Sequence, residues 1–324
     1  MMWKKVRRVE KIDFCMDTVI NQKVYGEGAE VVSDYVTNEI HRIENLFSFF
    51  KDGSDISRIN CEAGKNWIKV SDDTVSVLEI AKEVSEAGDG AFDVTTGILT
   101  DYWRRFLNKK VIPDKSTIHS RLSLVNYKDI LIDREDNLVK LARAGQKIDL
   151  GGIGKGYTGE RIKRIYQECS IVSAFINLGG NVVTIGKSSS GLPWTIGIRD
   201  PFSIEEKNLG ILKVIDQAVV TSGDYERYTD INGIKYHHIL DPRTGFPTQS
   251  GLRSVTIIAG SSALADALST ACFVLGLNKS LDLIKLFPNI KSIFITANNQ
   301  IFLSRELKYV FKKIDQNREF YFID

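Results

Sequence analysis

Apolar residues recur at intervals of three and four positions in the first half of the chain, which is the spacing of an amphipathic helix. Such a stripe runs through residues 29–50, and a second runs through residues 74–87 and ends at Gly88. A third helix is predicted from about residue 156 to residue 169. The first half of the chain is therefore predicted to be rich in helix.

The second half has a different pattern, in which short runs rich in β-branched residues are separated by turn residues. Strands are predicted at residues 172–177, 181–185, 194–199, 212–214, 218–221, 235–240, 253–258, 292–296 and 300–303. A helix pair at residues 262–275 and 279–286 interrupts them. Because helices and strands do not alternate regularly, we expect an α+β fold in which helices pack on a largely antiparallel β-sheet core.

The chain of 324 residues is longer than most single domains, and its length alone would also allow two closely packed ones. It has only six prolines and no low-complexity linker that would mark a boundary. We therefore expect a single domain over residues 1–324, with the recognisable motifs between about residues 12 and 305.

The composition of the chain argues against several classes of protein. The net charge of +2 provides no dominant basic field for nucleic acid, so we expect no nucleic-acid partner. No segment is long and apolar enough for an integral membrane span, and the first twenty residues are too charged for a signal peptide. The four cysteines are scattered without metal-finger spacing, which favours a reducing compartment and buried thiols. We therefore expect a cytoplasmic protein.

A glycine-rich loop lies between a predicted strand and the helix that begins near residue 156, with four glycines within residues 151–156. Such backbone can turn its N–H groups toward phosphate oxygens, and Lys155 can neutralise one of them. A tight turn without a ligand is the plain alternative. A Walker A loop is excluded because Gly156 follows Lys155, and a Rossmann fingerprint lacks its acidic residue at the end of the next strand.

Asp266 and Thr270 stand four residues apart in an alanine-rich helix, so a carboxylate and a hydroxyl share one face. Both offer the hard oxygen atoms that Mg²⁺ prefers. A lone helical aspartate is more often a solvated or paired charge. Here the neighbours are small and apolar, and a buried carboxylate needs a partner, so a metal site is a serious hypothesis.

Two of the four histidines, His237 and His238, are adjacent at the end of a predicted strand, just before the turn that begins at Asp241. Adjacent side chains on a strand point to opposite faces, so at most one of them enters a given site. A hairpin with an incidental histidine is an equal alternative. Aromatic residues in two further loops, at residues 47–50 and 90–97, can stack on a planar ring system, although such rings more often belong to the core.

Seven segments, in this order, resemble the FAD:protein FMN transferase (ApbE) family. They are residues 14–18, 54–60, 90–97, 149–157, 177–181, 238–245 and 263–271. The resemblance implies a flavin transferase fold and an enzyme that transfers FMN from FAD to a threonine or serine hydroxyl of an acceptor protein, with release of AMP. The chain has no threonine in a small-residue segment of the acceptor type, so we expect a separate acceptor polypeptide.

The resemblance also implies roles for individual residues. Mg²⁺ is expected on Asp266, Thr270 and the backbone carbonyl of Gly154, and His238 matches the family's histidine. The positions expected to contact FAD are Met16, Phe50, Ala91, Phe92, Asp93, Gly151, Tyr157 and Leu240. Asp17 replaces a common glycine, Phe50 a common hydroxyl-bearing aromatic, and Gly154 a common alanine.

Residue chemistry and resemblance agree on a mechanism. Mg²⁺ and Lys155 would neutralise the pyrophosphate, while the loop amides would position it. His238 or a nearby carboxylate would remove the proton of the attacking hydroxyl, and Asp266 is expected to be catalytic through the metal. Three other functions remain open at this stage: an FAD pyrophosphatase that uses water, a non-enzymatic FAD carrier, and the less favoured nicotinamide oxidoreductase.

Overall fold

The chain was analysed as a computed structural model that describes residues 8–203, 205, 207–315 and 318–324. Within these residues eight α-helices and a large β-sheet form the α+β architecture predicted above. The first charged residues of the chain, on which the expectation about a signal peptide partly depended, lie outside the described residues. In the described part no helix combines the length and the apolar character needed to cross a membrane.

The helices predicted from apolar spacing are present, with shifts at their ends. The helices are α1 (Ala29–Phe47), α2 (Asp55–Cys61), α3 (Asp72–Ala87), α4 (Gly97–Leu107), α5 (Lys115–Leu122), α6 (Gly154–Glu168), α7 (Ser262–Leu275) and α8 (Leu277–Lys285). Helix α1 ends three residues before its predicted end, because Ser48 is extended. Helix α7 begins as predicted, since the side chain of Ser261 accepts a hydrogen bond from the Leu264 amide.

The main sheet contains nine strands among the described residues. In spatial order they are β1 (Arg8–Cys15), β2 (Thr18–Tyr25), β6 (Ser173–Leu178), β7 (Asn181–Ile185), β10 (Ala218–Gly223), β13 (Leu252–Ala259), β14 (Lys291–Thr296), β15 (Ile301–Ser304) and β17 (Phe320–Ile323). Only the pair of β15 and β17 is parallel in this part of the chain. The largely antiparallel core is therefore confirmed.

Smaller sheets surround the main one. They are formed by β16 (Phe311–Lys313), β9 (Asn208–Val214) and β8 (Trp194–Arg199); by β3 (Ile68–Lys69), β5 (Leu138–Leu141) and β4 (Ile130–Asp133); and by the hairpin of β11 (Tyr228–Ile231) and β12 (Ile234–His237). Two short 3₁₀ turns lie at Tyr127–Asp129 and Arg305–Tyr309.

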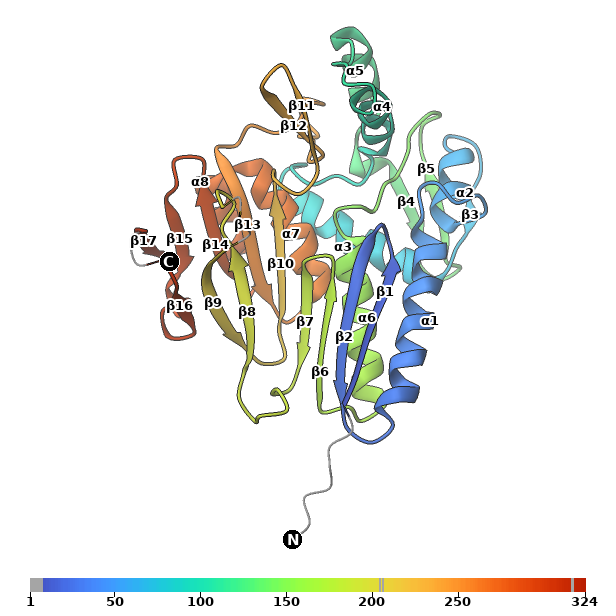
Figure 1. Ribbon diagram of the computed structural model, residues 1–324. Helices are drawn as coiled ribbons and strands as arrows, with labels where there is room; N and C mark the ends of the chain where they lie inside the picture. Colours follow the sequence, from blue (N-terminus) through green and yellow to red (C-terminus); the bar gives the residue numbers. More distant parts are fainter. Residues whose placement is uncertain (1–7, 204, 206, 316–317) are drawn as a thin grey trace.

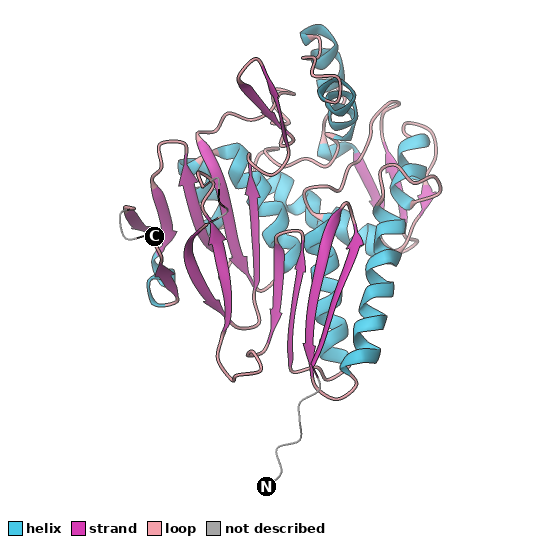
Figure 2. Cartoon of the chain, viewed as in Figure 1, coloured by secondary structure: helices cyan, strands magenta, loops and turns pink. Residues whose placement is uncertain are grey.

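Helices lie on one face of the main sheet and β8 and β9 cover part of the other, as Figures 1 and 2 show, whereas β1 leaves Ile12 and Phe14 exposed. Helices α1, α6 and α7 lie behind it, and their apolar faces build the larger core. Strands β8 and β9 lie in front of it and close a second apolar layer. Helices α4 and α5 lie at one end of the molecule, at the top of Figure 1 near the β11–β12 hairpin, and Trp103 of α4 stacks on Tyr236 of β12. Cover on both faces explains why every residue of β13 except Arg253 is buried, with no alternation along the strand.

The hairpin of β1 and β2 was not predicted as strands. Its turn consists of Met16 and Asp17, which both have positive φ angles of 55° and 57°. A two-residue turn of this kind demands left-handed backbone, where glycine, asparagine and aspartate are favoured. Aspartate at position 17 is therefore compatible with a position that is often glycine in the family that the sequence resembles.

The cysteines only partly follow the sequence expectation. Cys15 and Cys272 are buried, but Cys61 and Cys169 are exposed. The expectation of buried thiols is therefore wrong for two of the four. Cys61 is the last residue of α2 and Cys169 directly follows α6, and at these helix ends no core covers them.

Candidate active site

The centre of the candidate site is the crossing of α6 and α7. A Cβ atom at Gly156 would lie 2.4 Å from both the Cβ of Asp266 and the carbonyl oxygen of Ser262, and one at Gly159 would lie 2.8 Å from Ser262 Oγ. Only glycine permits this close approach. Gly156, which the sequence suggested for phosphate binding, and Gly159 thus allow helix packing. The amide of Gly156 also donates to Asp266 Oδ2 at 2.7 Å.

Asp266 is almost completely buried, with 4% of its surface exposed. Its Oδ2 accepts the Gly156 amide, while Oδ1 has no hydrogen-bond partner among the described residues. No lysine or arginine of the described chain pairs with it either. A buried carboxylate without a compensating cation is costly, so this residue suits a bound metal ion.

Thr270 lies one helical turn beyond Asp266 and is half-buried. Its Oγ1 is 3.3 Å from Ser222 Oγ at the end of β10, and Ser222 is also 2.7 Å from Ser269 Oγ. A Cβ at Gly152 would lie 3.3 Å from Thr270 Oγ1 and 3.1 Å from the Phe92 ring. The fold therefore brings the glycine loop, the Phe92 loop and α7 together, and the oxygen donors of α7 fit a hard cation such as Mg²⁺.

The glycine loop uses most of its own amides internally. Gly151 donates to Asp149 Oδ1 at 2.9 Å, and the amides of Ile153 and Gly154 donate to the Leu150 carbonyl. Between residues 151 and 157, all of which are described, only the amides of Gly152 and Lys155 have no partner. These two N–H groups are the part of the predicted phosphate cradle that remains available.

Lys155 supplies the positive charge of this loop. Its ammonium group forms no ion pair with any described residue, although its charge acts on Asp149, Glu226 and His238. Partial removal from water raises the pKa of Asp149, and Lys155 opposes that rise. An unpaired lysine beside two unpaired amides is an arrangement suited to an anionic group.

The adjacent histidines have different surroundings, but strand alternation is not the reason: β12 ends at His237, His238 lies in the bend that follows, and the strand predicted at residues 235–240 is therefore too long at its end. His237 is buried, its Nε2 donates to the Thr248 carbonyl at 2.9 Å, and its Nδ1 accepts from the Ile239 amide. His238 Nδ1 lies 3.1 Å from the Arg227 carbonyl, which can only accept. The proton therefore resides on Nδ1, and Nε2 of His238 keeps a free lone pair.

The environment of His238 also keeps its ring neutral. His238 is exposed, but neighbouring segments still shield its ring enough to lower its pKa below the usual histidine value, and the positive charges of Lys155 and Arg227 act in the same direction. A neutral imidazole with a free Nε2 can accept a proton. His238 thus has the protonation state of a general base, whereas His237 has a structural role.

Sequence reasoning missed Ser222 at the end of β10 and also Glu226 and Arg227 in the turn that follows this strand. Removal from water raises the pKa of Glu226, while Lys155 and two arginines oppose that rise. Arg227 donates to the Asp17 carbonyl at 3.0 Å and so joins this loop to the β1–β2 turn. The sequence did contain a signal for these residues, because a run of polar residues directly follows a buried strand. It was overlooked because the predicted strand ended before Ser222.

Several predicted FAD contacts lie close to the glycine loop. Met16 is in the β1–β2 turn, where its Sδ is 3.5 Å from Thr158 Oγ1. A Cβ at Gly154 would be 3.9 Å from Met16 Cε. The Gly154 carbonyl, a predicted metal ligand, accepts the Thr158 hydroxyl at 2.8 Å. Gly151 is exposed on the same loop.

Other predicted contacts have their side chains engaged elsewhere. The Tyr157 hydroxyl donates to Asp73 at 2.9 Å, and its ring packs on Phe47. Leu240 belongs to a small apolar cluster that includes Trp103 of α4. Phe50 is 55% exposed, and the Arg104 guanidinium lies 3.6 Å from its ring centre.

The loop with Ala91, Phe92 and Asp93 is buried. The Asp93 carboxylate accepts from the Thr95 amide and hydroxyl and from the Tyr127 amide. Its side chain thereby shapes the loop that presents Phe92 to the site. Burial raises the pKa of Asp93 in spite of these hydrogen bonds.

Known proteins resemble this chain in sequence and in overall fold. The model of the ApbE family matches residues 16–294. An FAD:protein FMN transferase of Klebsiella pneumoniae is 35% identical, over 93% of each chain, and one of Treponema pallidum is 32% identical, over 92% of this chain and 87% of its own. The crystal structure of an ApbE protein from Thermotoga maritima superimposes with a TM-score of 0.86 at 33% identity and covers 94% of this chain and 99% of its own. The chain belongs to the ApbE family.

Proposed function

We propose that this chain is a Mg²⁺-dependent FAD:protein FMN transferase that attaches FMN to a threonine or serine of a separate acceptor protein and releases AMP. The names of the similar proteins from Klebsiella pneumoniae and Treponema pallidum support the transferase activity. We also propose that residues 1–324 act as one domain.

The observation that carries the proposal is the free oxygen of Asp266. This carboxylate lies one helical turn from the Thr270 hydroxyl, and while one of its oxygens accepts the Gly156 amide of the glycine loop, the other accepts no hydrogen bond from the described residues. An inert structural aspartate would have its acceptors filled. This arrangement favours a reaction centre over a passive FAD carrier.

Asp266, Thr270 and the carbonyl of Gly154 are the residues that would hold Mg²⁺. When bound, the ion would neutralise the charge of the pyrophosphate. The Gly152 and Lys155 amides, together with the Lys155 ammonium group, would orient the phosphate oxygens. Met16, Ala91, Phe92 and Gly151 would contact the flavin nucleotide directly.

The remaining predicted FAD residues contribute differently in this proposal. Asp93, Tyr157 and Leu240 would shape the pocket wall, because their side chains already have protein partners. Phe50 would present its exposed ring, backed by Arg104, to a planar group.

The transfer step follows from the position of His238. Its Nε2 would take the proton of the acceptor hydroxyl as that oxygen bonds to the FMN phosphorus. The bond from this phosphorus to the bridging oxygen breaks, and AMP leaves with the electron pair. Water in place of the acceptor would give FMN and AMP, so positioning of the hydroxyl separates transfer from hydrolysis.

The test is intact-protein mass spectrometry of the chain with FAD, Mg²⁺ and threonine-bearing candidate acceptors. The proposal predicts that an acceptor gains the mass of one FMN, that AMP release accelerates when it is added, and that the enzyme's own mass stays constant. Fast AMP release without acceptor and without any FMN-modified protein would identify a pyrophosphatase instead. FAD binding without AMP release under any condition would identify a carrier.

A further inference from the structure

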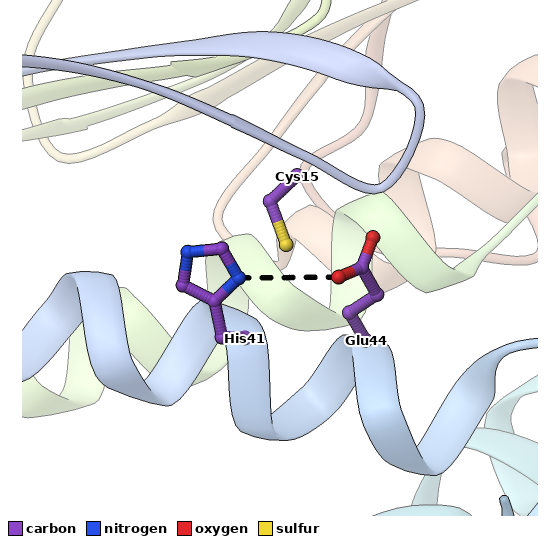
Figure 3. Close-up of side chains that lie close together, drawn as sticks. All are labelled: Cys15, His41 and Glu44. Atoms are coloured by element: carbon purple, nitrogen blue, oxygen red, sulfur yellow. Dashed lines mark ion pairs between the residues drawn. The ribbon is translucent and has the colours of Figure 1, made fainter. Parts of the chain in front are cut away.

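The β1–β2 hairpin and α1 bring together three side chains that the proposed transfer reaction does not use. Cys15 ends β1, and His41 and Glu44 are three residues apart on α1, on the same face. One ligand atom from each (a sulfur, a ring nitrogen and a carboxylate oxygen) lies within 4.8 Å of the other two. Figure 3 shows the Cys15 sulfur pointing between His41 and Glu44.

His41 is already oriented as a metal ligand. Its Nε2 lies 2.8 Å from Asp13 Oδ2, and its Nδ1 lies 3.9 Å from Glu44 Oε2. Because the Asp13 carboxylate can only accept, Nε2 carries a proton, and in the neutral ring Nδ1 keeps its lone pair. A carboxylate that holds the second nitrogen of a histidine is the usual support of a metal-binding imidazole.

The two carboxylate oxygens of Glu44 have different partners. Its Oε1 accepts the Met16 amide at 2.6 Å, which leaves Oε2 for the cluster. Cys15 is 2% exposed, whereas the side chains of His41 and Glu44 are 43% and 36% exposed. The sulfur therefore lies on the buried side of the cluster, and the other two ligands are open to solvent. A metal ion can reach the cluster from that open side.

We propose that Cys15, His41 and Glu44 bind one Zn²⁺ through Sγ, Nδ1 and Oε2, with a water molecule as the fourth ligand. A thiolate, an imidazole and a carboxylate suit Zn²⁺ in tetrahedral geometry, whereas Mg²⁺ prefers oxygen ligands alone. Zinc bonds are about 2.0–2.3 Å long, so the half-exposed His41 and Glu44 side chains turn inward on binding. Coordination forms the zinc–sulfur bond and releases the thiol proton to solvent.

The bound ion would tie the end of β1 to α1. The next two residues, Met16 and Asp17, form the β1–β2 turn. The carbonyl of Asp17 accepts a hydrogen bond from the Arg227 side chain, and the backbone carbonyl of Arg227 orients His238. Zinc would therefore stabilise the folded chain and fix the turn beside the proposed FAD site. It would do so from a position separate from Asp266.

The experiment uses the full chain carrying Asp266→Asn, which removes the other proposed metal site, after treatment with a chelator. Zn²⁺ alone is titrated in competition with a chromophoric chelator, and Co²⁺ is titrated as a spectroscopic probe. We expect one equivalent of Zn²⁺ per chain, a rise in melting temperature with Zn²⁺, and a thiolate-to-cobalt charge-transfer band.

Cys15→Ser should remove the charge-transfer band and lower zinc affinity at least tenfold, whereas the exposed-cysteine control Cys61→Ser should keep both. Because Cys15 is buried and its replacement can disturb folding, His41→Gln provides a second variant on the surface of the cluster, with the same expected loss of affinity. Absence of a zinc equivalent in the parent chain would overturn the proposal. So would binding that neither variant weakens, or a cobalt spectrum without a thiolate band.

Discussion

Asp93 and Asp266 are both buried carboxylates, and the sequence singled out both as site residues, yet their surroundings differ. Asp93 accepts three hydrogen bonds, from the Thr95 amide and hydroxyl and from the Tyr127 amide, at 2.6–2.8 Å. Asp266 accepts one, from Gly156, and its second oxygen has no partner in the part of the chain that the structure describes. Burial alone does not distinguish them.

The difference separates a structural carboxylate from one that is available for chemistry. The hydrogen bonds that Asp93 accepts come from Thr95 in its own loop and from Tyr127 in the neighbouring 3₁₀ turn. Its carboxylate therefore fixes the conformation of that loop. Asp266 has one oxygen without a hydrogen-bond donor among the described residues, on a helix that also carries Thr270 one turn away and that packs against the start of the helix with Lys155. Saturation of the acceptors, rather than burial, indicates which aspartate can bind a ligand.

Exchange of each aspartate for asparagine tests this distinction and gives the largest expected effect. Asp266→Asn should lower FMN transfer on the order of 10³-fold, because a metal ligand worth several kcal/mol is lost, while the melting temperature changes little. Asp93→Asn should lower the free energy of unfolding by about 1–3 kcal/mol, because an amide NH₂ then faces the Tyr127 amide. The measurements are transfer rates and thermal unfolding of both variants. An Asp266→Asn chain that transfers at the wild-type rate would contradict the distinction.

The two histidines extend the comparison. His238→Gln should lower the transfer rate about 10²-fold with little loss of stability, since general-base catalysis contributes at least that much. His237→Gln should mainly reduce stability, because His237 bridges Thr248 and Ile239 inside the core. Rate constants corrected for the folded fraction separate the two effects. Equal rate losses in both variants would remove His238 from its role.

The pH profile provides a further check on His238. A base acts when it is unprotonated, and the lowered pKa of His238 keeps it unprotonated as the pH falls below about 6.5. The acid limb of the transfer rate should therefore lie below the usual histidine value and should disappear in His238→Gln. An acid limb at the usual value, unchanged in the variant, would assign it to another group.

The packing of α6 against α7 should matter less for chemistry than for stability. Gly156→Ala places a Cβ 2.4 Å from the Ser262 carbonyl, so the helices must separate at a cost of about 1–3 kcal/mol. Gly260→Ala is the matched control, because nothing lies within 4 Å of its Cβ. Thermal unfolding of the two variants measures the difference. A fully stable Gly156→Ala would mean that this close approach is not required.

Thr270→Val gives the smallest expected effect. A neutral hydroxyl contributes less than a carboxylate, so the transfer rate should fall by about tenfold. The fall should be partly restored at higher Mg²⁺ if the hydroxyl acts through the metal. A titration of the rate against Mg²⁺ in the variant and the wild type checks this. A loss that Mg²⁺ does not relieve would indicate instead that Thr270 acts by packing.

Much of the fold was predictable because its helices and strands follow local rules. Helix α7 and strands β7 and β8 have their predicted bounds, since capping residues and turns mark them. The β1–β2 hairpin was missed because its alternation includes exposed apolar residues such as Ile12 and Phe14. Pairing of β2 with β6, roughly 150 residues away in the chain, stabilises this hairpin and leaves no local signal.

The site was predictable where chemistry is unusual within one segment. Asp266 among alanines and the two adjacent histidines were visible in the sequence. Contacts between distant segments decide the rest. They determine which aspartate has all its acceptor oxygens hydrogen-bonded, which histidine has its Nδ1 on a backbone carbonyl, and which glycines allow two helices to pack closely. The approach of Cys15 to His41 and Glu44 also depends on the packing of β1 on α1, so their spacing resembles no metal motif.

The central claim is that the free oxygen of Asp266 holds the metal that FMN transfer requires. The most direct test follows the mass of a threonine-bearing acceptor after incubation with the wild-type chain and FAD, with Mg²⁺ or with an excess of chelator. The account predicts an added FMN only when Mg²⁺ is present, and none with Asp266→Asn under either condition. Equal FMN attachment with and without Mg²⁺ would contradict it.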